Sequence, residues 1–220
     1  MRSFVLVLGA LVAGCGKPPA ENPPQPTRSE PAPQTVDRRP VVAAFGNSLS
    51  AGFGVDPGSS YPDFLQQELD RRGYRYRVVN AGISGDTTSG GLARVDAVTA
   101  LHPVLVILEL GANDGLRGVP LAVTRSNLER IIEALQGAGA RVVLAGMTLP
   151  PNYGPDYIRG FEKIYKDLAA RYRLRLIPFL LEGVALEPGM MQSDGLHPNT
   201  AGYRKVAANV MRVVEPLLAR

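Results

Sequence analysis

Apolar and polar positions alternate in blocks along the chain after residue 40. Short apolar runs, such as VLVILEL at 104–110, alternate with longer mixed stretches that are bounded by glycine or proline. Short continuous apolar runs are typical of strands buried on both faces. The predicted strands are residues 41–45, 76–79, 104–110, 141–145 and 174–179, and the predicted helices are residues 60–72, 86–101, 122–135, 157–172 and 200–219.

This order of elements predicts the fold class. Five strands that alternate with helices predict an α/β fold, with a doubly wound, five-stranded parallel sheet sandwiched by helices. In such folds, ligands bind at the carboxyl ends of the strands. We therefore expect the functional residues to lie in the loops that follow the strands.

The first 40 residues have a different character. Residues 1–14 contain an arginine followed by an apolar run that is too short to span a bilayer, which is typical of a signal peptide. Residues 15–40 are rich in proline and poor in apolar residues, so they predict an extended tether rather than a packed structure. The predicted domains are thus a signal peptide (1–14), a Pro-rich linker (15–40) and one folded domain (41–220).

Cys15, the single cysteine of the chain, directly follows Val12-Ala13-Gly14. This sequence resembles a bacterial lipobox, in which the cysteine becomes the acylated first residue. The resemblance implies a lipid-anchored protein of the cell envelope, and Gly16 in the next position favours the outer membrane, facing the periplasm. The alternative is a plain signal peptide in which Cys15 has no special role.

Charge and composition exclude several classes of function. The formal charge is +4, and the Lys and Arg residues are interspersed with Asp and Glu, which argues against a nucleic-acid partner. One cysteine cannot form an intrachain disulfide, and two histidines are too few for a His-rich metal cluster. We expect no metal and no cofactor, and a monomeric protein.

Four polar, glycine-containing segments follow the predicted strands. They are GNSLSAG (46–52), NAGISGDT (80–87), GANDG (111–115) and SDGLHPN (193–199). At one edge of a parallel sheet they would bring together a serine, a histidine, an aspartate and amide donors, which are the groups required for acyl transfer. Alternatively, Asp194 simply precedes the last helix and His197 is an ordinary loop residue. The nucleophile elbow G-x-S-x-G is absent, because residues 46–50 read GNSLS.

The longer blocks GNSLSAGFG, NAGISGDTTSGGLARV, VILELGANDGLRG, LPPNYGPDY and MMQSDGLHPN resemble, in order, those of the SGNH (GDSL-type) hydrolases. Within that superfamily they are most similar to the thioesterase I, lysophospholipase L1 and arylesterase group. The resemblance implies a flavodoxin-like hydrolase fold. It also implies that Ser48 is the nucleophile, that Asp194 and His197 complete the triad, and that Ser48 N–H, Gly85 N–H and Asn113 form the oxyanion hole.

The expected function is therefore a serine esterase that hydrolyses small acyl or aryl esters, thioesters or lysophospholipids through an acyl-enzyme. One alternative is an O-deacetylase of envelope carbohydrate or peptidoglycan, and a less favoured one is a non-catalytic lipid- or glycan-binding domain. Asn47 departs from the family pattern, which usually has aspartate there. If the aspartate charge matters, its absence should disfavour the protonated form of His197; if the position only holds the loop, activity should be unaffected.

Overall fold

The computed structural model describes residues 37–219. The predicted signal peptide, Cys15 and most of the predicted linker lie outside the described residues. Residues from Asp37 onward form one compact unit.

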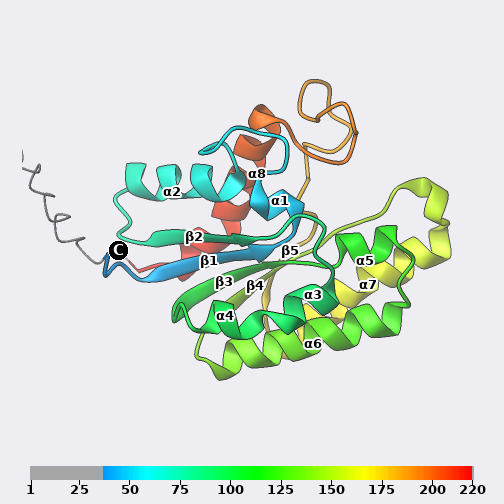
Figure 1. The fold of residues 1–220 in the computed structure, drawn as a ribbon, viewed down its shortest axis with the longest axis horizontal. Helices are drawn as coiled ribbons and strands as arrows, with labels where there is room; N and C mark the ends of the chain where they lie inside the picture. Colours follow the sequence, from blue (N-terminus) through cyan, green and yellow to red (C-terminus); the bar gives the residue numbers. More distant parts are fainter. Residues whose placement is uncertain (1–36, 220) are drawn as a thin grey trace, which may run out of the picture. The chain divides into compact units, whose positions relative to one another are not determined.

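The centre of this unit is a five-stranded parallel sheet with the strand order β2-β1-β3-β4-β5 (Figure 1). This arrangement confirms the predicted fold class. Because β1 is paired with β2 on one side and β3 on the other, the chain reverses its winding direction at β1, as in a doubly wound sheet. The strands are β1 (Val41–Gly46), β2 (Arg77–Gly82), β3 (Pro103–Glu109), β4 (Arg141–Ala145) and β5 (Arg175–Ile177).

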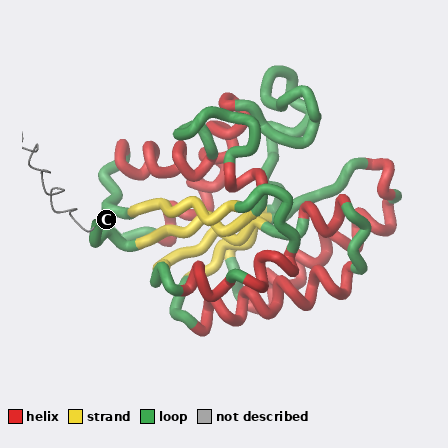
Figure 2. The backbone as a smooth tube through the Cα atoms, in the orientation of Figure 1, coloured by secondary structure: helices red, strands yellow, loops and turns green. Residues whose placement is uncertain are grey.

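Helices cover both faces of the sheet (Figure 2). One layer contains α1, α2 and α8, and the other contains α3, α4, α6 and α7 (Figure 1). None of the described helices is long and apolar enough to cross a membrane. The helices are α1 (Ser48–Ala51), α2 (Tyr61–Arg71), α3 (Thr88–Ala93), α4 (Val95–Thr99), α5 (Ala112–Leu116), α6 (Leu121–Gly137), α7 (Pro155–Tyr172) and α8 (Thr200–Val214), with 3-10 turns at Pro151–Tyr153 and Glu215–Leu217.

The helix predicted over residues 86–101 is interrupted in the structure. Arg94 leaves helical geometry between α3 and α4, with φ −122° and ψ 12°. Its guanidinium binds Asp86 at 2.7 Å and donates to the carbonyls of Ala81 and Gly46, at 2.8 and 2.9 Å. At the break, the Arg94 side chain thus connects this helical segment to the carboxyl ends of β1 and β2.

Two further boundaries differ from prediction. Residues 112–116, expected to be a loop, form the short helix α5. The last helix, predicted to reach residue 219, ends at Val214 and continues as a 3-10 turn that contains Pro216. Proline lacks a backbone N–H and cannot continue an α-helical hydrogen-bond ladder.

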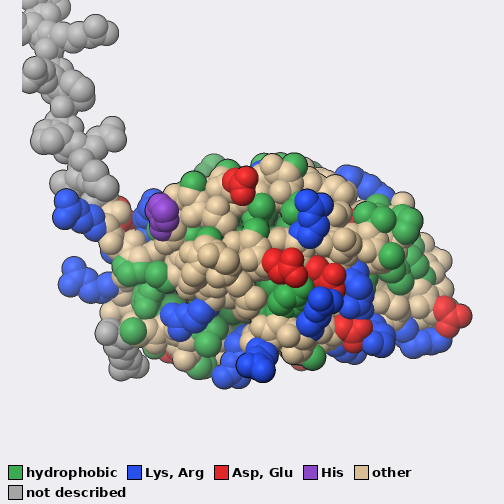
Figure 3. All heavy atoms as spheres, turned by 90° about the horizontal axis from the view of Figure 1, so that it is seen from below, with side chains coloured by type: hydrophobic (Ala, Val, Ile, Leu, Met, Phe, Trp, Pro, Cys, Tyr) green, Lys and Arg blue, Asp and Glu red, His purple; other side chains and the backbone are tan. Residues whose placement is uncertain are grey.

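The surface charge is mixed, as the composition predicted. On the face shown in Figure 3, Lys and Arg side chains lie among Asp and Glu side chains. Ion pairs between neighbouring helices account for part of this mixing, including Arg125 with Asp167 at 2.5 Å and Arg171 with Glu129 at 2.9 Å. Such pairs at partly exposed sites contribute little to stability.

A buried carboxylate lies beneath the turn that follows β1. Glu109, the last residue of β3, has no exposed surface. Its Oε2 accepts hydrogen bonds from the Asn47 backbone N–H at 3.1 Å and from Ser50 Oγ at 2.9 Å. Desolvation raises the pKa of Glu109 to about 7, although these hydrogen bonds partly offset the effect.

The turn itself leaves no room for a side chain at Gly46. A Cβ at this position would collide with the Glu109 carboxylate and with Ser50 Oγ. Glycine at residue 46 thus allows the carboxylate to approach the backbone of the turn. The β1–α1 turn and the end of β3 consequently form one closely packed unit.

Replacing Glu109 by glutamine should change how stability depends on pH. Folded Glu109 keeps its proton up to about pH 7, whereas the unfolded chain releases it near the ordinary value of 4.5. Stability from this group is therefore lost as pH rises between these values. Relative to wild type, Glu109→Gln should gain about 2–3 kcal/mol in the free energy of unfolding between pH 5 and pH 8.

Urea denaturation at both pH values measures this difference. Glu187→Gln, a change at an exposed carboxylate, is the matched control, and its difference from wild type should not vary in the same way. An equal pH dependence for wild type and Glu109→Gln would show that Glu109 does not titrate in this range.

Candidate active site

Ser48 begins α1, and Asn47 alone separates it from the end of β1. The Asn47 side chain caps this short helix, since its Oδ1 accepts from Leu49 N–H at 3.0 Å. Gly52, with φ +79°, closes the helix after only one turn. A sharp strand-to-helix turn of this kind presents the serine at the edge of the sheet, although the sequence lacks the G-x-S-x-G pattern.

The structure brings the three predicted triad residues together. His197 Nε2 lies 2.8 Å from Ser48 Oγ, and His197 Nδ1 lies 2.6 Å from Asp194 Oδ2. Ser48 and His197 are 149 residues apart in sequence. These distances form a continuous hydrogen-bonded chain from nucleophile to base to carboxylate.

The Asp194 carboxylate is also held by its own loop. Its Oδ1 accepts hydrogen bonds from the backbone N–H groups of Leu196 and His197, at 2.9 and 3.0 Å. Desolvation acts to raise the pKa of Asp194, but the hydrogen bond from the His197 side chain and the two from backbone N–H groups outweigh it and lower the pKa to about 2. Asp194 is therefore ionised at neutral pH and can stabilise a protonated imidazole.

The two other predicted oxyanion donors lie on neighbouring segments. Gly85 has φ +83°, a left-handed conformation that favours glycine. The Asn113 side chain donates to the carbonyl of Asp86 at 2.9 Å, which links α5 to the Gly85 loop. This bond uses one of the two amide hydrogens of Asn113. Arg117 also binds this loop, donating to the Gly85 carbonyl at 3.0 Å.

Two polar residues close to the triad in sequence or space have structural roles. Ser50 is buried and bonded to Glu109, so it belongs to the architecture of the turn. Asp114 is also buried and accepts from the Thr88 backbone and hydroxyl, at 2.8 and 2.5 Å. His102 immediately precedes β3, at the opposite edge of the sheet from the triad.

Three residues near the triad were not identified from the sequence. Phe53 packs its ring against His197, with ring centroids 4.6 Å apart. Gln192 donates a hydrogen bond to the Phe53 carbonyl at 2.7 Å. Glu109 had a detectable signal, because it is a single acidic residue in an otherwise apolar strand. Phe53 and Gln192 had none, because their contacts depend on how two distant loops pack.

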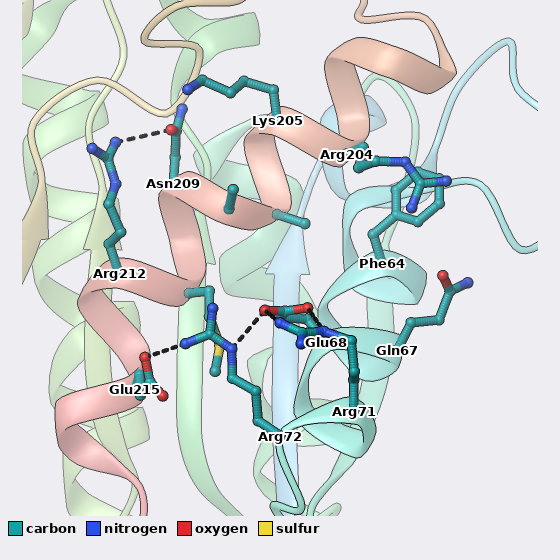
Figure 4. Close-up of a pocket in the computed structure, with 13 residues that line it drawn as sticks. Phe64, Gln67, Glu68, Arg71, Arg72, Arg204, Lys205, Asn209, Arg212 and Glu215 are labelled. Atoms are coloured by element: carbon teal, nitrogen blue, oxygen red, sulfur yellow. Dashed lines mark hydrogen bonds and ion pairs between the residues drawn. The ribbon is translucent and has the colours of Figure 1, made fainter.

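A groove elsewhere on the surface runs between α2 and α8 (Figure 4). Its volume is about 540 Å³, and its lining includes several arginines. Two of them, Arg71 and Arg72, pair with Glu68 at 2.7 and 2.5 Å, and Arg72 also pairs with Glu215 at 2.6 Å. None of the triad residues lines this groove, so the hollow is separate from the candidate site.

Comparison with known proteins identifies the family of this chain. The model of the GDSL-like Lipase/Acylhydrolase family matches residues 44–205. Esterase TesA of Pseudomonas aeruginosa is 48% identical over 179 residues, which cover 81% of this chain and 89% of that protein. Thioesterase 1/protease 1/lysophospholipase L1 of Escherichia coli K12 is 40% identical over 179 residues, which cover 81% of this chain and 85% of that protein.

A solved structure supports the same assignment. The crystal structure of TesA superposes with a TM-score of 0.78 at 46% sequence identity, covering 81% of this chain and 99% of that one. The family match and the sequence identity extend over most of the folded part. The chain therefore belongs to the GDSL-like lipase/acylhydrolase family and is an enzyme that hydrolyses ester bonds.

Proposed function

We propose that this enzyme is a serine esterase in which Ser48 attacks the carbonyl of an acyl or aryl ester, or of a thioester. The observation that supports this most directly is the pair of short distances, 2.8 Å from Ser48 to His197 and 2.6 Å from His197 to Asp194. The similarity to a thioesterase and lysophospholipase adds thioesters and lysophospholipids to the candidate substrates.

The chemistry follows from the order of these groups. His197 Nε2 takes the proton of Ser48 Oγ as the oxygen attacks the substrate carbonyl, and a tetrahedral intermediate forms. The intermediate collapses to an acyl-enzyme, and His197 protonates the departing alcohol or thiol. Water activated by His197 then hydrolyses the acyl-enzyme and releases the acid. Asp194 holds the imidazole in place and stabilises its protonated form in both steps.

The backbone N–H groups of Ser48 and Gly85 and the side-chain amide of Asn113 are proposed as the oxyanion hole. A donor aimed at the developing negative charge typically lowers the barrier by about 2.7–4 kcal/mol. The bonds from Asn113 to the Asp86 carbonyl and from Arg117 to the Gly85 carbonyl restrain the Gly85 loop. Donors held in this way need little rearrangement when the charge develops.

Exposed apolar side chains suggest where an acyl or aryl group binds. Phe53, Ile83 and Leu196 are 48%, 50% and 45% exposed, and each comes from a loop that carries or adjoins a proposed catalytic residue. Leu149, by contrast, is buried against Gly115. The proposed acyl or aryl surface is therefore the rim formed by the first three residues.

Ser48→Ala should lower kcat/KM for p-nitrophenyl esters by at least about 10⁴-fold, because the nucleophile is lost. It should also abolish labelling by a fluorophosphonate. Ser126→Ala, at an exposed serine of α6, is the control and should retain activity. Hydrolysis of acetylated glycans in preference to p-nitrophenyl esters of any chain length would favour the deacetylase alternative, and retained activity in Ser48→Ala would exclude the proposed mechanism.

Asn47→Asp should move the acid limb of the kcat/KM pH profile upward, by about 0.3–1 pH unit. The Asn47 side chain touches the nucleophile, since Ser48 Oγ lies 3.4 Å from Asn47 Oδ1. A carboxylate at this place would stabilise the protonated imidazole of His197. The profile is measured with a soluble p-nitrophenyl ester, and an unchanged acid limb would mean that residue 47 only caps α1.

We also propose that Cys15 is acylated, that residues 15–40 tether the domain, and that the enzyme is held in the cell envelope, with the outer membrane favoured. The support is the lipobox-like sequence before Cys15 and the absence of any other cysteine. Several acyl chains on one residue anchor a protein stably, since each buried CH₂ contributes about 0.8 kcal/mol.

Cys15→Ala should therefore abolish incorporation of labelled palmitate and shift the protein from the membrane fraction to the soluble fraction. Both are measured after expression of the whole chain in a bacterial host that processes lipoproteins. Wild-type protein without label, or Cys15→Ala protein that stays in the membrane fraction, would contradict the proposed anchor.

A further inference from the structure

The loop that carries Asp194 and His197 is closed on itself by local hydrogen bonds. Gln192 N–H donates to the His197 carbonyl at 2.8 Å, and Gly195 N–H donates to the Gln192 carbonyl at 3.1 Å. Met191 and Pro198 form an isolated antiparallel bridge at the base of the loop. These contacts set the shape of the loop, but they do not determine where the loop lies relative to Ser48.

The side chain of Gln192 connects this loop to the nucleophile loop. Its Nε2 donates to the Pro198 carbonyl at 2.9 Å and to the Phe53 carbonyl at 2.7 Å. A glutamine amide nitrogen has two hydrogens, so both are used. Within residues 37–219, the hydrogen bonds that join residues 190–199 to residues 46–54 are the one from Gln192 to Phe53 and the one between His197 and Ser48.

The Phe53 backbone continues the connection to the nucleophile. Phe53 N–H donates to the Ser48 carbonyl at 3.0 Å, and its own carbonyl accepts from Gln192. The backbone of Phe53 therefore links Ser48 to Gln192, and the Gln192 side-chain amide links Phe53 to Pro198, the residue after His197. The Phe53 ring also packs on His197, at a centroid distance of 4.6 Å.

The neighbouring residue leaves space for this amide. Gly54 has φ +75°, and a Cβ at this position would collide with the side-chain amide of Gln192. The nucleophile loop thus accommodates the glutamine by close packing as well as by a hydrogen bond.

We infer that Gln192 is a positioning residue for catalysis, whose two amide hydrogens hold the Ser48 loop and the His197 loop at the separation needed for proton transfer. This inference rests on the proposed roles of Ser48 and His197. It assigns to Gln192 no contact with the substrate. Proton transfer requires donor and acceptor within hydrogen-bond distance, and a misplacement of about 1 Å can cost about 100-fold in rate.

The test compares Gln192→Ala with Gln136→Ala in the whole chain. Gln136 is a matched control, because its exposed side-chain amide also donates to a backbone carbonyl of another element, that of Tyr172 at 3.3 Å, far from the triad in the fold. The measurements are the rate constant for fluorophosphonate labelling of Ser48, kcat and KM for p-nitrophenyl acetate, and Tm.

Gln192→Ala should slow labelling and lower kcat by about 10- to 100-fold, with KM within about twofold of wild type. Gln136→Ala should label at the wild-type rate. The acid limb of the pH profile should stay in place for Gln192→Ala, because the contacts between Asp194 and His197 remain. Labelling within about twofold of wild type, or equal losses in both variants, would overturn the inference.

Two further variants keep the test decisive if Gln192→Ala does not fold. Gln192→Glu has the same size but, as a carboxylate, cannot donate to the two carbonyls, so it should lose rate to a similar degree. Gly54→Ala should slow labelling in the wild-type background and cost less in the Gln192→Ala background, where no amide remains to collide with it. If the losses of labelling rate in Gly54→Ala and Gln192→Ala simply add in the double variant, the proposed contact between residues 54 and 192 is contradicted. If wild type itself is not labelled, the proposed esterase mechanism fails, and the inference fails with it.

Discussion

The buried carboxylate of Glu109 is the constraint on which the catalytic edge depends. It stands at the end of β3 and holds the turn after β1 through the Asn47 N–H and the Ser50 hydroxyl. Burying a carboxylate is costly unless it is hydrogen-bonded or keeps a proton. Glu109 is hydrogen-bonded, because two donors bind its Oε2. Desolvation also raises its pKa to about 7, which favours the protonated form. The position of Ser48 is thereby tied to the central pair of strands.

His197, the proposed catalytic base, reaches the same edge of the sheet by a different route. The end of β1 delivers Ser48, whereas His197 comes from a long segment after β5 and has no strand to hold it. Its loop is shaped by its own hydrogen bonds and by Asp194, which binds two of the loop's backbone N–H groups. The contacts through Gln192 and Phe53 then relate this loop to the nucleophile. The sheet positions Ser48, and contacts made by loop side chains position His197.

Asp194 and Glu109 illustrate how surroundings separate two carboxyl groups. Asp194 accepts hydrogen bonds from the His197 ring and from backbone N–H groups, so it remains ionised well below neutral pH. Glu109 is fully enclosed, so its proton is retained to much higher pH. The first is suited to stabilising a positive charge on the imidazole. The second is suited to supporting a turn, because its carboxyl group accepts hydrogen bonds from the Asn47 N–H and the Ser50 hydroxyl.

The sequence by itself determined the fold class and the order of the strands along the chain, and its resemblance to the SGNH hydrolases indicated Ser48, Asp194 and His197 as the proposed triad. Continuous apolar runs such as 104–110 are incompatible with an exposed strand, and polar loops after parallel strands must meet at one edge. The break at Arg94, the helix at 112–116 and the roles of Gln192 and Phe53 were decided only by the tertiary structure. Each depends on contacts between residues far apart in the chain, such as Arg94 with the Gly46 carbonyl or Gln192 with the Phe53 carbonyl. Local pattern carries no information about such contacts, because the energy that selects them exists only once the loops are packed together.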